Sequence, residues 1–302
     1  MPNGIIVKGI GGFYYIETDS GLYECRARGI FRNNEITPLP GDNVIISIED
    51  EEKKIGNIEK IIDRDNFFVR PSVANVNQML IVVSVNSPKI DYYLLDKLLL
   101  TAEKKNINPV ICINKIDLDL ESYHRNFMRI YKNIGYDVFA TSSKTKTGYE
   151  KLKNVLENKI SVFAGQSGVG KSTILNNILN ELVMETGDIS KKIKRGKHTT
   201  RHAELIELKE GGYIVDTPGF SSFLLENIEF EELENYYREF KELIGICKYS
   251  GCSHISEPGC KVKNNFVDGY IDKGRYERYV FFYNELKKEK SFIWKKRKKA
   301  KR

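Results

Sequence analysis

Residues 165–172 read Gly-Gln-Ser-Gly-Val-Gly-Lys-Ser, which is the pattern of a phosphate-binding loop. A strand-like run at residues 160–164 precedes the loop and a helical pattern follows it, as this motif requires. We expect the glycines to let backbone N–H groups surround a β-phosphate, and Lys171 to neutralise the β- and γ-phosphate oxygens during catalysis. The residues predicted to bind phosphate or its Mg²⁺ here are Gly165, Gln166, Ser167, Gly168, Val169, Gly170, Lys171, Ser172 and Thr173.

A second motif, Asn114-Lys115-Ile116-Asp117, follows a strand-like run at residues 110–113 and could recognise guanine. The Asp117 carboxylate can accept hydrogen bonds from N1–H and the 2-amino group of guanine, whereas adenine offers no such pair of donors. Lys115 can lie over the base, and Asn114 can tie this loop to the phosphate loop. An ordinary turn is the alternative for this motif alone. Together the two motifs favour GTP over ATP, and Ser142 is expected in a further base-contacting loop.

Two further segments are typical of the switches that sense a γ-phosphate. Asp216-Thr217-Pro218-Gly219 ends a strand-like run, so Asp216 is expected to hold Mg²⁺ through water and the Gly219 N–H to meet the γ-phosphate. A threonine of the first switch normally completes the Mg²⁺ shell. Thr199 and Thr200 both fit, and the predicted magnesium set is Ser172, Thr200 and Asp216, with Thr200 also counted as catalytic beside Lys171.

The residue after Gly219 is Phe220, which cannot orient an attacking water as the glutamine of a Ras-like enzyme does. We therefore expect slow intrinsic hydrolysis that a partner accelerates, with His198 or a group of the partner as the catalytic element. A surface or packing role is the alternative for His198.

A third cluster reads Cys247, Cys252, His254 and Cys260, with the spacing C-x4-C-x-H-x5-C. Three thiolates and an imidazole form a closed tetrahedral shell, which is typical of one structural zinc ion. Reduced thiols in a small core are the alternative. The five cysteines are an odd number in a chain that we expect to be cytoplasmic, which argues against a disulfide framework. Cys25 and Cys112 are expected to be buried strand residues.

The elements that must position these motifs divide the 302 residues into three predicted domains. Residues 1–68 show short strands between Gly, Asn and Asp turns, which indicates an OB-type β-barrel, with a generic SH3-like barrel as the alternative. Residues 69–225 alternate strands with helices, as in a doubly wound α/β sheet. Residues 226–302 show helical faces at residues 230–244 and 276–286 around the cysteine cluster, followed by a basic tail.

The net charge of +7 resides in the last eight residues, Lys-Lys-Arg-Lys-Lys-Ala-Lys-Arg. We expect this tail to be disordered and suited to a polyanion, with a merely solubilising role as the alternative. The N-terminal sequence lacks the pattern of a signal peptide, and no apolar run approaches the length of a membrane span. A cytoplasmic protein without membrane contact is therefore expected.

The guanine motif precedes the phosphate loop, which reverses the order found in an ordinary GTPase. With the barrel before these motifs and the cysteine cluster after them, the chain resembles the bacterial small-ribosomal-subunit-dependent GTPase A family, the circularly permuted GTPases of ribosome biogenesis. The resemblance implies an OB domain, a permuted G domain and a zinc domain that bind the small ribosomal subunit and its rRNA late in maturation. It also implies subunit-stimulated GTP hydrolysis and maps the switch histidine of the family onto His198. Asn77 and Ser143 depart from the pattern of the family.

The leading hypothesis is thus a monomeric GTPase that is switched on by the small subunit. A GTP-gated RNA-binding scaffold with incidental hydrolysis is the alternative, and an ATPase or kinase is a third possibility that Asp117 argues against. Because the second switch leads almost directly into the zinc domain, we expect loss of the γ-phosphate to move that domain relative to the barrel and release the RNA.

Overall fold

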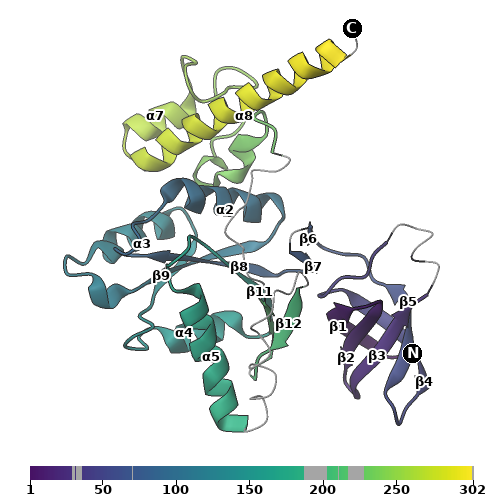
Figure 1. Cartoon of the computed structure of the whole chain (residues 1–302). Helices are drawn as coiled ribbons and strands as arrows, with labels where there is room; N and C mark the ends of the chain where they lie inside the picture. Colours follow the sequence, from purple (N-terminus) through teal and green to yellow (C-terminus); the bar gives the residue numbers. More distant parts are fainter. Residues whose placement is uncertain are drawn as a thin grey trace.

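A computed structural model describes residues 1–28, 31, 36–69, 71–186, 203–209, 211–216 and 228–300, with only the backbone for residues 180–186 and 293–300. Three parts follow one another along the chain: a β-barrel, a central α/β sheet and a C-terminal part that lies against two helices of the sheet (Figure 1). Within the described residues, no helix is both long and apolar enough to cross a bilayer.

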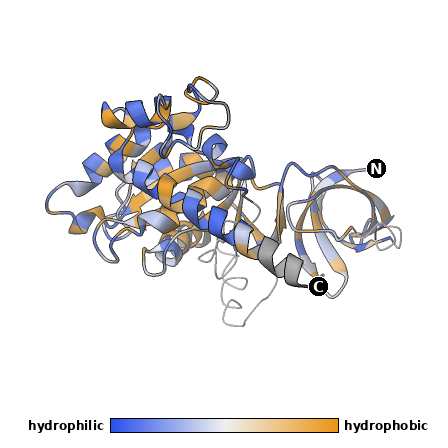
Figure 2. Ribbon diagram, turned by 90° about the horizontal axis from the view of Figure 1, so that it is seen from above, coloured by the Kyte–Doolittle hydropathy of each residue, from blue (hydrophilic) through white to orange (hydrophobic). Residues whose placement is uncertain are grey.

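The N-terminal part is a closed barrel of five strands, as the sequence predicts. Its strands run in the order β1-β2-β3-β5-β4, and a further pairing between β1 and β4 closes the barrel, which is seen end-on in Figure 2. Alternate residues such as Ile6, Ile16 and Ile46 point inward and are fully buried. The strand bounds are Asn3–Ile10 (β1), Phe13–Thr18 (β2), Gly21–Ala27 (β3), Asn43–Asp50 (β4) and Ile55–Ile61 (β5).

The central sheet has the order β10-β9-β8-β11-β13-β12, and all of its neighbouring strands are parallel except β12, which runs antiparallel to β13. Every residue of β8 is buried, as expected for a strand that is covered on both faces. One core cluster packs α2 and α3 on one face, and a second packs α4 and α5 on the other. The strands are Gln78–Ser84 (β8), Asn108–Asn114 (β9), Asp137–Ala140 (β10), Ile160–Ala164 (β11), Glu204–Glu207 (β12) and Tyr213–Asp216 (β13). The helices are Tyr92–Lys104 (α2), Tyr123–Asn133 (α3), Tyr149–Leu156 (α4) and Lys171–Thr186 (α5).

The chain reverses direction across this sheet between β8 and β11. From β8 it adds β9 and β10 toward one edge, and then returns to place β11 on the other side of β8. In α/β sheets, ligands bind where the strand order reverses, outside the carboxyl ends of the strands. This reversal places residues 114–117, which begin at the last residue of β9, near residues 165–172, which follow β11, although the two segments are far apart in the chain.

A short hairpin joins the barrel to the sheet. Strands β6 (Phe67–Val69) and β7 (Ser72–Ala74) form it, and the Asn75 amide donates to the Gly41 carbonyl of the barrel (2.9 Å). The barrel also meets the sheet directly, because β1 pairs with β12 at Lys8 and Glu204. The Lys8 ammonium lies 2.6 Å from the Glu204 carboxylate, so a half-exposed ion pair reinforces this narrow seam.

The C-terminal part differs in two respects from the sequence predictions. The single helix predicted over residues 230–244 is wrong, because two 3-10 turns, Leu233–Tyr236 (η2) and Arg238–Phe240 (η3), occupy this region and Tyr237 between them is extended. Leu233, Tyr237 and Phe240 are still buried in the core. The burial of this face was therefore predicted correctly, whereas the helical conformation of its backbone was not. The helices that follow are Lys261–Val267 (α7) and Lys273–Ala300 (α8).

The predicted disorder of the basic tail is also wrong as far as Ala300, where α8 ends. Lysine and arginine are good helix formers, and adding residues to an existing helix avoids the cost of nucleation. The helical face predicted at residues 276–286 is confirmed within α8, because Tyr276, Tyr279 and Leu286 are buried.

A buried ion cluster joins the C-terminal part to the sheet. Asp96 of α2 is fully buried and accepts hydrogen bonds from Arg275 Nη1 (2.6 Å) and Arg278 Nε (2.5 Å) of α8. Arg275 also donates to both carboxylate oxygens of Glu239 (2.7 and 3.2 Å). Arg238 adds a contact to Glu103 at the end of α2 (2.5 Å). Since every charge in the cluster has a partner, it holds α2 and α8 in one arrangement.

We predict that Asp96→Asn will lower the free energy of unfolding by about 3 to 5 kcal/mol, because two arginines would remain in the interface without their shared carboxylate. Urea unfolding followed by circular dichroism measures the change. The control is Glu277→Gln, which removes the partner of an exposed ion pair with Lys273 in the same helix and should change stability by less than about 0.5 kcal/mol. Equal stability of Asp96→Asn and wild type would contradict the role given to the cluster.

Candidate nucleotide site and metal cluster

The loop between β11 and α5 has the backbone that a phosphate-binding loop needs. Gly165, Gly168 and Gly170 all have positive φ angles, of 132°, 81° and 102°. A Cβ atom on Gly165 would lie 2.2 Å from the carbonyl oxygen of Val82, so the loop passes directly over β8. The N-terminus of α5 follows at Lys171, where free backbone N–H groups and the helix dipole favour an anion.

Lys171 lies over this loop. Its ammonium donates to the carbonyl oxygens of Gly165 (2.7 Å) and Gln166 (2.8 Å). Partial burial lowers the pKa of Lys171, because the charged form loses hydration. A phosphate group beside the ammonium would compensate for that loss, so the position suits a lysine that binds an anion.

Asn114 links the guanine motif to the phosphate loop, which confirms the sequence prediction for this residue. Its side chain is fully buried at the end of β9, and its amide nitrogen donates to the Val169 carbonyl (2.9 Å). Lys115, which has a left-handed backbone, donates to the carbonyl oxygens of Ser87 and of Gly168 (2.7 Å for Gly168). Two consecutive side chains thereby hold the motif against the loop.

Asp117 lies in a 3-10 turn (Ile116–Leu118, η1), where the Ser142 hydroxyl donates to its Oδ1 (2.5 Å). Ser142 is itself fully buried. The loop after β10 is thus fixed against the guanine motif, and the structure brings together Asn114, Asp117 and Ser142 as the sequence predicts. The Ser143 hydroxyl and N–H also donate to Asn114 Oδ1 (3.3 Å each).

Asp216 ends β13 with its side chain exposed. Partial desolvation raises its pKa, and the carboxylate of Glu204, its partner across the strand pair, raises it further. A cation beside this carboxylate would favour its charged form and oppose both effects. Asp216 at the end of β13 and the exposed Ser172 at the start of α5 are the described residues of the predicted Mg²⁺ set. The predicted switch residues His198, Thr199, Thr200, Gly219 and Phe220 lie outside the described residues.

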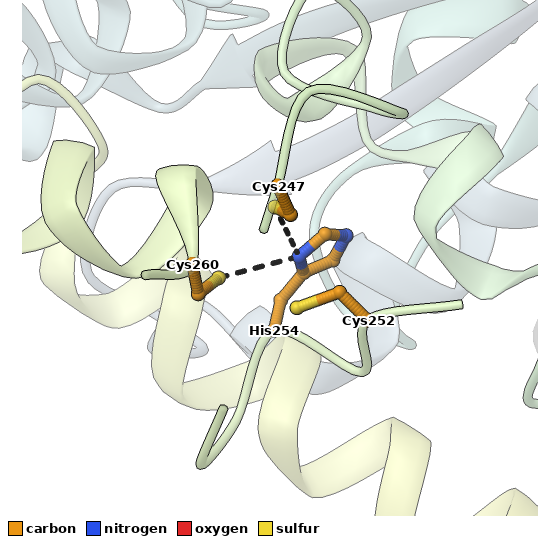
Figure 3. Close-up of side chains that lie close together, drawn as sticks. All are labelled: Cys247, Cys252, His254 and Cys260. Atoms are coloured by element: carbon orange, nitrogen blue, oxygen red, sulfur yellow. Dashed lines mark hydrogen bonds between the residues drawn. The ribbon is translucent and has the colours of Figure 1, made fainter. Parts of the chain in front are cut away.

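The four predicted metal ligands converge in the C-terminal part (Figure 3). The ligand atoms of Cys247, Cys252, His254 and Cys260 all lie within 4.8 Å of one another. His254 Nδ1 is 3.7 Å from Cys247 Sγ and 3.4 Å from Cys260 Sγ. The arrangement could hold a metal ion.

Surrounding groups orient these ligands. The Glu234 carboxylate contacts Nε2 of His254, which leaves Nδ1 facing the cysteines. Backbone N–H groups of Lys261 and Lys263 point at the sulfurs of Cys247 and Cys260 (3.3 Å each). Burial raises the pKa of Cys252 to about 12, and a bound cation would favour its thiolate.

Some residues that contact the nucleotide site or the metal cluster belong to none of the sequence motifs. Ser87, Glu234 and Asn177 contact Lys115, His254 and Ser143 respectively, and each lies far along the chain from its partner. Metal-binding histidines commonly donate their second ring N–H to a carboxylate, so a carboxylate partner for His254 could have been expected from the sequence. The position of Glu234 in the chain gives no indication that it fills that role.

Comparison with known proteins matches the chain to one family over most of its length. The RsgA GTPase domain family matches residues 61–226, and the RsgA N-terminal domain family matches residues 3–58. A protein of Ruminiclostridium cellulolyticum named small ribosomal subunit biogenesis GTPase RsgA is 55% identical over 289 residues, which cover 95% of this chain and 94% of that protein. A protein of the same name from Clostridium novyi is 48% identical, with 94% and 97% covered.

Solved structures agree with this match. YloQ, described as a circularly permuted GTPase, superposes with a TM-score of 0.82 at 40% identity, covering 96% of each chain. YjeQ from Thermotoga maritima superposes with a TM-score of 0.82 at 38% identity, covering 94% of this chain and 98% of that one.

We predict that Gly170→Ala will weaken GDP binding by about tenfold or more, because the new methyl group would lie 2.4 Å from Asn114 Nδ2 and break the bond to Val169. Titration with a fluorescent GDP measures the affinity. Gly135→Ala is the control, since Gly135 has a similar φ of 96° but open space around it. The control should lose about 1 kcal/mol of stability and keep its GDP affinity. Unchanged GDP affinity of Gly170→Ala would contradict the assignment.

Proposed function

The chain belongs to the RsgA GTPase family, and on that premise we propose that it hydrolyses GTP to GDP and phosphate on the small ribosomal subunit and assists its late maturation. The observation that carries this proposal is the hydrogen bond from Asn114 to Val169, which joins a guanine motif to a phosphate loop in one site. The names of the relatives supply the ribosomal context.

We assign nucleotide binding to residues from three segments. Asp117, held by Ser142, accepts hydrogen bonds from guanine, and Lys115 covers the base. Backbone N–H groups of residues 165–170 and the N-terminus of α5 bind the phosphates, with Lys171 on the β- and γ-phosphate oxygens. Ser172 and Asp216 hold Mg²⁺ together with a switch threonine, Thr200 or Thr199. Mg²⁺ neutralises charge that develops on the phosphate oxygens.

Hydrolysis needs a group that orients water, and we assign this role to His198 from its place in the switch sequence. Phe220, the residue that follows Gly219, has no hydrogen-bonding side chain that could do it. Stimulation by the subunit follows if the partner fixes the switch segment in its active arrangement.

We also propose one zinc ion in the C-terminal cluster, with Cys247, Cys252, His254 and Cys260 as its ligands. In a tetrahedral zinc site, Zn–N and Zn–S bonds of ordinary length place a nitrogen about 3.6 Å from a sulfur. The distances of 3.4 and 3.7 Å from His254 Nδ1 lie on either side of that value. With no open position, the ion would stabilise the fold and take no part in catalysis.

The barrel and the C-terminal part are proposed to bind rRNA of the subunit, with the protein acting as a cytoplasmic monomer. Release is proposed to depend on the nucleotide state. The ion cluster around Asp96 holds the C-terminal part to α2, so a movement between that part and the barrel would carry α2 with it. The contacts of the barrel with the sheet, which include the pairing of β1 with β12 and the bond from Tyr213 to Glu17, are only partly buried, and this supports movement at the barrel side.

We predict that purified small subunits will accelerate GTP hydrolysis by at least about tenfold, and that His198→Ala will reduce the stimulated kcat by about 10² or more. Phosphate release with and without subunits measures both rates. His124→Ala is the control, because His124 contacts Asp119 in another part of the chain, and it should keep the stimulated rate.

Two outcomes would redirect this proposal. Stimulation of well under about tenfold would favour a GTP-gated RNA-binding scaffold with incidental hydrolysis. A full stimulated rate in His198→Ala would remove the catalytic role of that residue and leave the rest of the site unchanged.

We predict about one zinc ion per chain by elemental analysis, with loss of the ion in Cys252→Ser. Chelation should lower the melting temperature of the wild-type protein, because the free energy of metal binding contributes to folding. Cys25→Ser, which changes a buried cysteine of the barrel, is the control and should retain zinc. A folded wild-type protein without zinc would refute the assignment.

A further inference from the structure

Asn177 lies on α5, less than two turns after the phosphate loop, and none of the sequence motifs includes it. Its amide nitrogen donates to the backbone carbonyl of Ser143 (3.3 Å) and to the hydroxyl of Tyr149 (3.0 Å). An asparagine amide carries two N–H donors, so both of these contacts can form together. Tyr149 begins α4 and is almost completely buried, so its hydroxyl depends on an internal partner.

The loop that Asn177 contacts is the one that contacts the guanine motif. Ser143 donates to Asn114 Oδ1 through its N–H and its hydroxyl, and Asn114 donates onward to Val169. The neighbouring Ser142 donates to Asp117. A closed series of contacts, here called the circuit, therefore links the phosphate loop by hydrogen bonds through Asn114 and Ser143 to Asn177. The backbone of α5 then leads from Asn177 back to the phosphate loop.

Each half of this circuit constrains a different side of the site. The bond from Asn114 to Val169 fixes the guanine motif at the loop side. The bond from Asn177 to Ser143 fixes the loop after β10 at the helix side. Because α5 is a rigid element that begins at the phosphate loop, a contact on it sets the spacing between the base-contacting loops and the phosphate-binding N–H groups.

We propose that Asn177 is a positioning residue for guanine recognition, which holds the Ser142–Ser143 loop so that Asp117 is presented to the base at a fixed distance from the phosphate loop. The inference rests on the proposed function, because it assumes that this site binds a guanine nucleotide. Loss of the Asn177 contact removes the hold of α5 on the loop, whose bonds to Asn114 and Asp117 remain, and so weakens base recognition, while the phosphate loop itself keeps its structure.

The test is Asn177→Ala in the full chain, with three probes. Fluorescent GDP should dissociate about 3 to 10 times faster than from wild type, which is the effect expected for losing the hydrogen bond to Ser143. IDP lacks the 2-amino group, which in GDP donates a hydrogen bond to the Asp117 carboxylate. The preference for GDP over IDP should therefore fall by about threefold. Affinity for pyrophosphate, which has no base, should stay within about twofold of wild type, whereas general damage to the site would reduce it as well.

Tyr149→Phe is the matched control. It removes the second partner of Asn177 and leaves the contact to Ser143, so GDP dissociation should change by less than about twofold. Should Asn177→Ala fail to fold, Asn177→Asp serves instead. Its side chain has the same size as asparagine, but the carboxylate repels the Ser143 carbonyl, so this variant should also accelerate GDP release.

The outcomes separate the two proposals. Wild-type protein that does not bind GDP would refute the proposed function. Wild-type protein that binds GDP, with unchanged GDP release and GDP preference in the folded Asn177 variant, would overturn the role of Asn177 alone. A loss of pyrophosphate affinity equal to the loss of GDP affinity would overturn it too.

Discussion

A single buried amide holds the nucleotide site together. Asn114 donates to the phosphate loop through its nitrogen and accepts from the loop after β10 through its oxygen. Because it is fully buried, loss of the bond to Val169 would leave its amide nitrogen without that acceptor, at a cost of about 1 to 3 kcal/mol, whereas its oxygen accepts from both Thr141 and Ser143. The same amide requires a glycine at position 170, because a Cβ atom there would lie 2.4 Å from Asn114 Nδ2 and displace it.

The three parts of the chain are joined by contacts of very different kinds. A buried cluster of paired charges fixes the C-terminal part to α2. The contacts between the barrel and the sheet are more exposed, and they include the residue pair between β1 and β12, the ion pair from Lys8 to Glu204, the hydrogen bond from Tyr213 of β13 to Glu17 of β2 (3.0 Å) and a short hairpin. A buried charge network strongly resists separation because each unpaired ion would be costly, while a half-exposed pair is weakened by solvent. This difference in burial is the structural basis for placing the proposed movement on the side of the barrel.

Much of the fold followed from local patterns. The short strands between turns in residues 1–68 predicted a β-barrel, and the alternation of strands with helices in residues 69–225 predicted an α/β sheet. These patterns are local because burial on one or two faces of a strand dictates its residues. The residues over 230–244 were correctly placed in a core but wrongly placed in one helix. Aromatic side chains at helical spacing can also reach a core from successive 3-10 turns, and periodicity does not distinguish the two.

The sequence by itself determined which chemistry the chain can carry. The glycines and lysine of the phosphate loop, the Asp117 carboxylate and the three cysteines with His254 are recognisable because their chemistry demands those residue types at short spacing. The tertiary structure alone decided the long-range partners. These partners meet in single contacts between distant segments: Asn177 with Ser143, Glu234 with His254, and Asp96 with Arg275. No local pattern encodes them, because each depends on how the sheet and helices pack.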